Sequence, residues 1–191
     1  MHGADHPALL KVPAAALCAS CHEVDSDSFV GAHFGYAVAP ESCTQCHTPH
    51  ASDNDGLMTA SSHQPVAEGE CTACHNDPGA AEPFGTAGDD VTGMCLECHD
   101  EGDVRPDGVH AAVADGDCLD CHSPHGSSLP ALMAGPSSTI CLECHTEVEE
   151  QLTGVSRHAP AVAGCLECHT AHGDASTKLL VAEPTTLCLG C

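Results

Sequence analysis

Residues 110–126 read HAAVADGDCLDCHSPHG, and this stretch contains the pattern that decides the fold. At its centre stands Cys-x-x-Cys-His, from Cys118 to His122, with one histidine upstream and a second, His125, just beyond it. Seven copies of Cys-x-x-Cys-His occur along the chain, and an eighth Cys-x-x-Cys lies at residues 188–191. The first cysteines of successive pairs are 23 to 28 residues apart, and this nearly constant period indicates tandem repeats.

The repeats predict one domain over residues 1–191, built from consecutive modules. Half-repeats lie near residues 1–32, 33–62, 63–109, 110–157 and 158–191. We expect each cysteine pair on one or two helical turns, with Gly, Pro, Ser and Thr loops between them. The predicted fold class is mostly irregular coil with short α-helices and little or no β-structure. Residues 139–152 lack helix breakers and predict one longer helix.

The amino-acid composition cannot build an ordinary hydrophobic core. Leu, Ile, Val and Phe number 32 of 191 residues, a share below the ~20% that marks disordered chains of high net charge. The net charge is −24, with 28 acidic residues against four Lys and Arg, so nucleic acid and anionic membrane surfaces are poor partners. No stretch of sequence is apolar enough to span a membrane. Something other than side chains must supply the apolar interior.

Cys-x-x-Cys-His is the signature of covalent c-type haem attachment. On a helical turn, positions i, i+3 and i+4 share one face, so two thiols can form thioethers with one porphyrin while the histidine binds its iron. Zinc ribbons also use paired Cys-x-x-Cys, and secreted scaffolds use many disulfides. Neither alternative explains a histidine after every complete pair. Eight haems, stacked as the core, would replace the missing apolar side chains.

The motif itself predicts the attachment residues and the proximal ligands. We expect thioether bonds at every pair: Cys18, Cys21, Cys43, Cys46, Cys71, Cys74, Cys95, Cys98, Cys118, Cys121, Cys141, Cys144, Cys165, Cys168, Cys188 and Cys191. The proximal iron ligands are the motif histidines: His22, His47, His75, His99, His122, His145 and His169. For the eighth pair we expect either a histidine at the next position or one supplied by a neighbouring subunit.

Nine further histidines are available, and eight haems with histidine on both faces need all but one of them when position 192 is a histidine. The predicted distal ligands are His2, His33, His50, His63, His110, His125, His158 and His172. In an H-x-x-H segment both histidines lie on one side of a turn, so the second must ligate a different haem. His6 is left over. Met58, Met94 and Met133 are expected to pack rather than to ligate.

The segments CTQCHTPH, CLDCHSPHGSSLPALM and CLECHTAHG resemble the doubled-motif cytochrome family, a group of multihaem c-type cytochromes. The resemblance covers nearly the whole chain, although residues 75–94 depart from it and leave the distal ligand of the Cys95/Cys98 haem open. It implies secretion, haem loading outside the cytoplasm and electron transfer. Some multihaem cytochromes of this general type polymerise into extracellular filaments whose haems form a continuous wire.

The expected function is therefore electron transfer along closely packed bis-histidine haems, without catalysis. We expect a subunit of an extracellular or cell-surface filament (a nanowire), assembled head-to-tail after removal of a secretion signal. Its partners would be copies of itself, other cytochromes and an extracellular electron acceptor, with His2 or His6 ligating a haem of the next subunit.

Two alternatives stay open. One is a monomeric periplasmic shuttle or electron-donor subunit. The other is a multihaem reductase, which needs an open iron that is often marked by Cys-x-x-Cys-Lys. That motif does not occur in the sequence.

Overall fold

A computed structural model of the chain describes residues 9–173 and 178–190. Its contacts divide it into two compact units, which are described separately. Unit 1 comprises Met1–Asp89 and Pro124–Leu132, and unit 2 comprises Asp90–Ser123 and Met133–Cys191. The single-domain organisation expected from the repeats stays a prediction.

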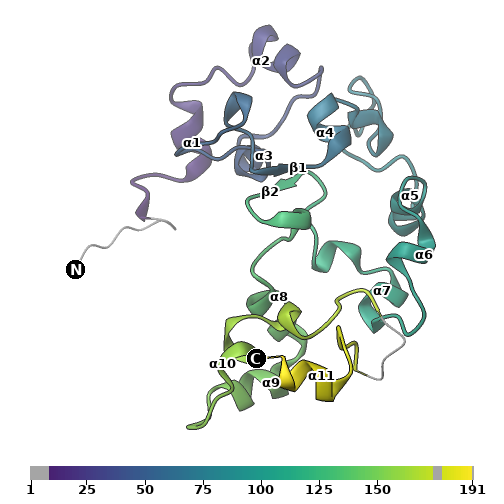
Figure 1. The fold of residues 1–191 in the computed structure, drawn as a ribbon. Helices are drawn as coiled ribbons and strands as arrows, with labels where there is room; N and C mark the ends of the chain where they lie inside the picture. The colour runs from purple at the N-terminus through teal and green to yellow at the C-terminus, as the bar shows by residue number, and fades with distance from the viewer. Residues whose placement is uncertain (1–8, 174–177, 191) are drawn as a thin grey trace. The chain divides into compact units, whose positions relative to one another are not determined.

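Short helices dominate both units (Figure 1). Unit 1 contains α1 (Ala14–Ala19), α2 (Asp27–Ala32), η2 (Pro40–Ser42), α3 (Cys43–Cys46), η3 (Asp55–Leu57), β1 (Ser61–Ser62), α4 (Gln64–Glu68), η4 (Cys71–Ala73), β2 (Gly126–Ser127) and η6 (Pro130–Leu132). Unit 2 contains α5 (Val91–Leu96), α6 (Glu101–Val104), α7 (Ala111–Asp115), η5 (Cys118–Asp120), α8 (Ser137–Cys144), α9 (Thr146–Leu152), α10 (Ala159–Ala163), η7 (Cys165–Glu167) and α11 (Pro184–Leu189). This is the coil-rich fold with short helices that the sequence predicts.

Capping and turn residues keep these helices short. α4 and α7 each end at a glycine in the left-handed conformation, Gly69 with φ 76° and Gly116 with φ 90°, which is a common helix stop. Asp90 and Asp100 cap the start of α5 and α6 by accepting backbone N–H bonds. The strands β1 and β2 form one small antiparallel pair. No helix in residues 9–173 or 178–190 is both long and apolar enough to cross a membrane.

The prediction of one continuous helix over residues 139–152 is wrong. α8 ends and α9 begins at His145, whose φ of −90° and ψ of 55° lie outside the helical region. The His145 N–H donates to the Cys141 carbonyl at 3.0 Å, while the His145 carbonyl accepts from Val148 and Glu149 at 3.1 and 3.2 Å. The motif histidine therefore closes one helix and opens the next, because it satisfies backbone groups at both helix ends.

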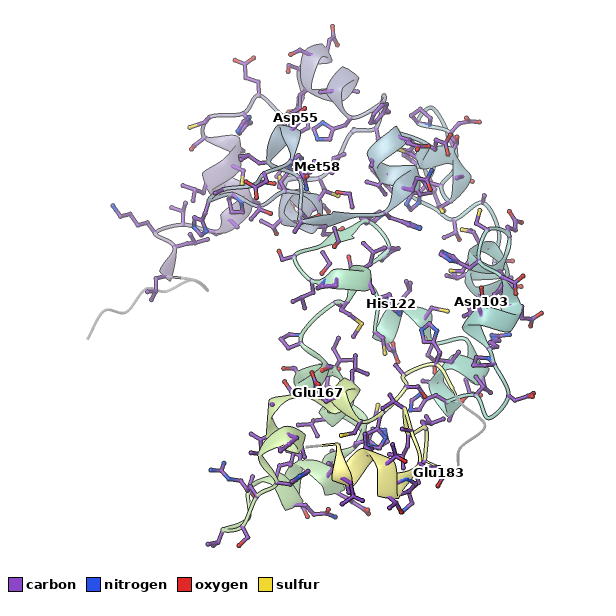
Figure 2. All side chains as sticks on the ribbon, viewed as in Figure 1. Asp55, Met58, Asp103, His122, Glu167 and Glu183 are labelled. Carbon is purple, nitrogen blue, oxygen red and sulfur yellow. The ribbon has the colours of Figure 1, made fainter. Side chains whose placement is uncertain are left out.

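Side chains in the described part of the chain build almost no core. Tyr36 and Thr59 are the buried side chains there, at 4% and 5% exposure, and none is fully enclosed. The chain exposes 13327 Å², whereas a folded monomer of 19.4 kDa exposes roughly 8,500 Å² and two separate halves roughly 10,000 Å². The acidic side chains labelled in Figure 2, Asp55, Asp103, Glu167 and Glu183, are all exposed.

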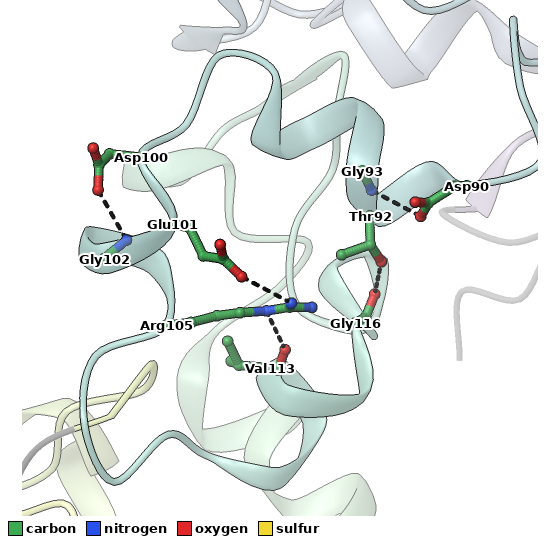
Figure 3. A network of polar contacts seen from close by, with 9 residues as sticks. All are labelled: Asp90, Thr92, Gly93, Asp100, Glu101, Gly102, Arg105, Val113 and Gly116. Atoms are coloured by element: carbon green, nitrogen blue, oxygen red, sulfur yellow. Dashed lines mark hydrogen bonds and ion pairs between the residues drawn. The ribbon is translucent and has the colours of Figure 1, made fainter.

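Polar contacts join α5, α6 and α7 in unit 2 (Figure 3). The Thr92 hydroxyl donates to the Gly116 carbonyl at 3.1 Å, which ties α5 to the end of α7. Arg105 follows α6 and donates from Nε to the Val113 carbonyl at 3.2 Å. Its guanidinium also lies 3.6 Å from Glu101. These contacts connect α5, which carries Cys95, to α7, and α7 in turn to the segment that follows α6.

Tyr36 is the buried aromatic side chain among the described residues of unit 1. Its hydroxyl donates to the Asn76 carbonyl at 2.7 Å, and its ring lies 5.5 Å from the Phe84 ring, measured between centroids. Asn76 directly follows the motif histidine His75. Tyr36 therefore braces the backbone of the third motif against an earlier segment of the same unit.

We expect Tyr36→Ala to lower the urea midpoint of unit 1 in the haem-loaded protein more than other single side-chain truncations there. Truncation removes both the buried ring and the hydrogen bond, whereas Tyr36→Phe removes the hydrogen bond alone. The alanine effect should be roughly two- to threefold larger than the phenylalanine effect. Equal midpoints for the two variants would show that the ring contributes nothing to stability. Phe34→Ala is the matched control, because the Phe34 ring is exposed.

Candidate haem-binding sites

All seven complete motifs form the same closed turn. In each, the N–H of the motif histidine donates to the carbonyl of the first cysteine at 2.9 to 3.1 Å. The pairs are His22 with Cys18, His47 with Cys43, His75 with Cys71, His99 with Cys95, His122 with Cys118, His145 with Cys141 and His169 with Cys165. This i to i−4 bond brings the two cysteines and the histidine to one face of the turn.

The motifs fall into two structural classes. Cys18, Cys95, Cys141 and Cys188 lie in the last turns of helices that begin before the motif, namely α1, α5, α8 and α11. The other four pairs begin their own short turn, in α3, η4, η5 and η7. After each of these four, the chain folds back so that a residue further along pairs with the motif histidine. We name these segments return loops: residues 47–58, 75–86, 122–133 and 169–180, the last of which the structure describes at residues 169–173 and 178–180.

The return loops orient the motif imidazoles. The Nδ1–H of His47 donates to the Gly56 carbonyl at 2.7 Å, and His75 and His169 make the same bond to the carbonyls of Phe84 and Lys178 at 3.1 and 3.0 Å. Since a carbonyl can only accept, Nδ1 carries the proton in each case. The lone pair of Nε2 is then directed away from the loop and is available to a metal.

A second histidine faces several of the motif histidines. The ring centroids of His33 and His47 are 6.2 Å apart, those of His75 and His125 5.8 Å, those of His110 and His145 6.1 Å, and those of His122 and His172 5.9 Å. In the His75–His125 pair, the two Nε2 atoms face each other at 3.5 Å. Each pair joins a predicted proximal ligand to a predicted distal ligand.

These distances fit two axial ligands on one iron. A metal–imidazole bond is about 2 Å long, so two nitrogens on opposite faces of a haem iron lie about 4 Å apart. The His75–His125 pair needs to open by only about half an ångström to reach that separation. Two thiols on one turn can attach the porphyrin, and an Nε2 lone pair beside them with a second imidazole opposite can supply both axial ligands of a bis-histidine haem c.

A model of the doubled CXXCH motif family matches residues 1–27, 36–62, 63–104, 110–150 and 158–191. These segments cover most of the chain and include residues 75–94, where the sequence departs from the repeat pattern. The chain belongs to the doubled CXXCH motif family. It is a multihaem c-type cytochrome whose motifs carry covalently bound haem c in electron transfer. No curated protein matches the chain.

The H-x-x-H segment at residues 122–125 sends its two histidines to different partners. In this cytochrome His122 faces His172, whereas His125 faces His75. This separation is expected, because neighbours on one turn cannot reach opposite faces of one porphyrin. The arrangement therefore supports, for this segment, a second histidine that serves another haem.

Burial lowers the pKa of two of the predicted distal imidazoles. Desolvation, followed by the charges that His75 and His63 can carry, lowers the pKa of His125. Desolvation and His122 likewise lower the pKa of His172. Because neutral imidazole is the form that ligates metals, both shifts favour iron binding at physiological pH.

Cysteines of successive motifs lie close together within each unit. In the chain before haem attachment, burial and the adjacent Cys165 thiol raise the pKa of Cys141 to about 11. Burial and the adjacent Cys18 thiol raise the pKa of Cys43 in the same way. Two further thiols are shifted in the same direction: burial and then Cys71 raise the pKa of Cys46, while burial, Asp120 and Cys144 raise that of Cys121.

Other predicted ligands lie outside these four facing pairs. His22 is exposed beside an open cavity of about 460 Å³ that also includes Glu23 and Asp25. His50 and His158 are exposed, and no ring or hydrogen-bond partner is found for either side chain among the described residues. His63 donates from Nδ1 to the Pro124 carbonyl at 2.9 Å. The predicted ligands His2 and His6 and the attachment residue Cys191 lie outside the described residues.

The return loop is the functional element that the sequence interpretation missed. Its signal is present: Met58, Met133 and Leu180 stand at the same offset from their motif histidines and pair with them. We expect the side chains of Met58 and Met133 to pack rather than to ligate. In the structure, their backbones pair with the motif histidines that begin their loops. Leu57, Leu132 and Leu179, each one residue earlier, all have positive φ between 52° and 57°. The same left-handed conformation therefore recurs at one position of three return loops.

Proposed function

We propose that this cytochrome carries haem at all eight Cys-x-x-Cys pairs and conducts electrons from one haem to the next, without catalysis. Haem supplies a one-electron redox couple when bound. The observation that best supports conduction is the closeness of thiols from successive motifs, Cys18 beside Cys43 and Cys141 beside Cys165. Thioether sulfurs lie at the porphyrin edge, so these residues keep the edges of neighbouring cofactors together.

The facing histidines favour an electron carrier over an enzyme. With haem bound, each of the four pairs would offer one imidazole to each face of the iron, and no axial position would then be left for a substrate. A haem that reduces a substrate at iron needs such an open position. The sequence also contains no Cys-x-x-Cys-Lys motif. We therefore place the chain among electron-transfer proteins.

We expect the purified, exported protein to contain eight haems, all low-spin. Intact mass measures the haem count, and EPR of the oxidised protein measures the spin state. Carbon monoxide should leave the spectrum of the reduced protein unchanged, because histidines occupy both faces of each iron. A stable high-spin signal at full haem loading would instead favour the reductase alternative. Fewer than eight haems would refute attachment at every pair.

We further propose that copies assemble head-to-tail into an extracellular filament, with histidines of one copy ligating a haem of the next. Multihaem c-type cytochromes are typically exported. The exposed imidazoles of His50 and His158, together with His2 and His6, are the candidates for such contacts. A net charge of −24 opposes association of identical chains, so iron–histidine bonds and bound cations must offset the repulsion. The alternative is a monomeric periplasmic shuttle.

Assembly should depend strongly on salt. The Debye length falls from about 30 Å at 0.01 M salt to about 8 Å at 0.15 M, which screens repulsion between acidic subunits. We expect electron micrographs of the haem-loaded protein to show filaments that lengthen over this range. A monodisperse monomer at both salt concentrations, with full haem content, would favour the periplasmic shuttle. The haem count in the same samples separates a failure of assembly from a failure of attachment.

A further inference from the structure

Two of the facing histidine pairs have the same separation along the sequence. His75 faces His125 and His122 faces His172, and both pairs join residues 50 positions apart. In each pair, a motif histidine of the return-loop class faces the second histidine of an H-x-x-H segment that belongs to a later motif. The first pair lies in unit 1 and the second in unit 2. The same arrangement therefore occurs independently in both units.

A backbone bridge holds the second histidine of each pair. The His63 N–H donates to the His125 carbonyl at 3.1 Å, and the His110 N–H donates to the His172 carbonyl at 2.9 Å. Antiparallel pairing continues beside each bond, between Ser62 and Gly126 in unit 1. Val109 and Gly173 pair in the same way in unit 2. The bridge fixes where His125 and His172 leave the backbone.

In unit 2 the bridge joins histidines that face two different motifs. His172 faces His122, and its bridge partner His110 faces His145. The ring separations of these pairs, 5.9 and 6.1 Å, both suit two ligands on one iron. One backbone hydrogen bond therefore connects ligands that point to the Cys118/Cys121 motif and to the Cys141/Cys144 motif.

We propose a specific assignment of distal ligands, in which three haems each bind a histidine that lies far along the chain from their own cysteines. This assignment rests on haem attachment at these cysteines. His125 is the distal ligand of the haem at Cys71 and Cys74, and His172 is the distal ligand of the haem at Cys118 and Cys121. His110 is the distal ligand of the haem at Cys141 and Cys144. The bridge between His110 and His172 makes these two haems a coupled pair, so a change in one ligand's backbone alters the coordination of both.

Combining a ligand variant with haem deletions tests this ligand assignment. His172→Ala should convert one haem to the high-spin state, as counted by EPR. In a Cys118→Ala/Cys121→Ala background, which lacks the proposed partner haem, His172→Ala should add no high-spin signal. In the matched Cys165→Ala/Cys168→Ala background, which lacks the haem of its own motif, the signal should persist. The reverse pattern would overturn the proposal.

Two additional measurements keep the test decisive. A cryo-EM or crystal structure of the haem-loaded wild-type chain shows each axial ligand directly, so variants that fail to fold do not leave the question open. Any distal ligand other than His172 at the Cys118/Cys121 haem overturns the ligand assignment. The mass of every variant reports its haem count. A wrong haem count refutes haem attachment at these cysteines, whereas a correct haem count with a different set of axial ligands refutes only the ligand assignment.

Discussion

The haem-free chain is expected to remain unfolded under conditions in which the haem-loaded chain melts cooperatively. In residues 9–173 and 178–190, Tyr36 and Thr59 are the buried side chains. The exposed area of 13327 Å² exceeds the roughly 10,000 Å² of two folded units of this size. Burial of apolar area is the main favourable contribution to folding. Without an apolar group to cover, the chain cannot offset the backbone entropy that it loses.

Circular dichroism of protein produced without its export signal, where haem is not attached, measures this effect. We expect a spectrum typical of unfolded chains and no cooperative transition on heating. The control is the same sequence produced with export and full haem loading, which should show helices and a sharp transition. A haem-free sample with native-like helix content and cooperative melting would contradict the idea that the cofactors form the core. Added salt screens repulsion between the acidic side chains. If salt does not restore structure, this repulsion is not the cause of unfolding.

The second large effect is expected when one motif is removed from between two others. We call three motifs whose thiols lie near one another in this way a contact series. In unit 2, the Cys121 thiol is within electrostatic range of Cys144, and the Cys141 thiol lies beside Cys165. The Cys141/Cys144 motif therefore stands between its two neighbours. Cys141→Ala with Cys144→Ala should remove one haem and open a gap between the flanking motifs. Because electron transfer slows steeply with distance, conduction through the protein should fall sharply.

The matched control removes an outer motif of the same series. Cys165→Ala with Cys168→Ala also deletes one haem, but it leaves the contacts between the Cys118/Cys121 and Cys141/Cys144 motifs in place. The conductance of films of each haem-loaded variant, normalised to haem content, gives the comparison. Equal losses in the two variants would mean that conduction does not follow the order of thiol contacts. Intact mass must show that each variant lacks one haem.

Much of the local structure could be predicted from particular residues. The spacing of Cys118, Cys121 and His122 requires one helical turn, and every complete motif forms that turn with the same backbone bond. Glycines such as Gly69 and Gly116 end helices as expected. The low aliphatic content predicts a chain without a side-chain core. These predictions succeed because they depend on contacts within a few residues along the chain.

The continuous helix over residues 139–152 was predicted wrongly for a physical reason. Helix propensity and the absence of Gly and Pro favour that helix, but the conformation of His145 interrupts it. The return loops were missed because their stabilising bonds join residues such as His47 and Gly56, which lie on separate turns. A single copy of the motif does not report which carbonyl its histidine ring will reach, and the constant offset becomes visible only when the loops are compared.

The sequence by itself determined the number and positions of the Cys-x-x-Cys pairs, the supply of histidines and the need for a non-protein core. The tertiary structure alone decided which histidine faces which motif, as in the pairs His75–His125 and His122–His172. The nine histidines outside the motifs are chemically equivalent as ligands, so composition and spacing cannot assign each of them to one motif. Folding distinguishes them because backbone bridges, such as that between His110 and His172, place only certain rings within about 6 Å of each other.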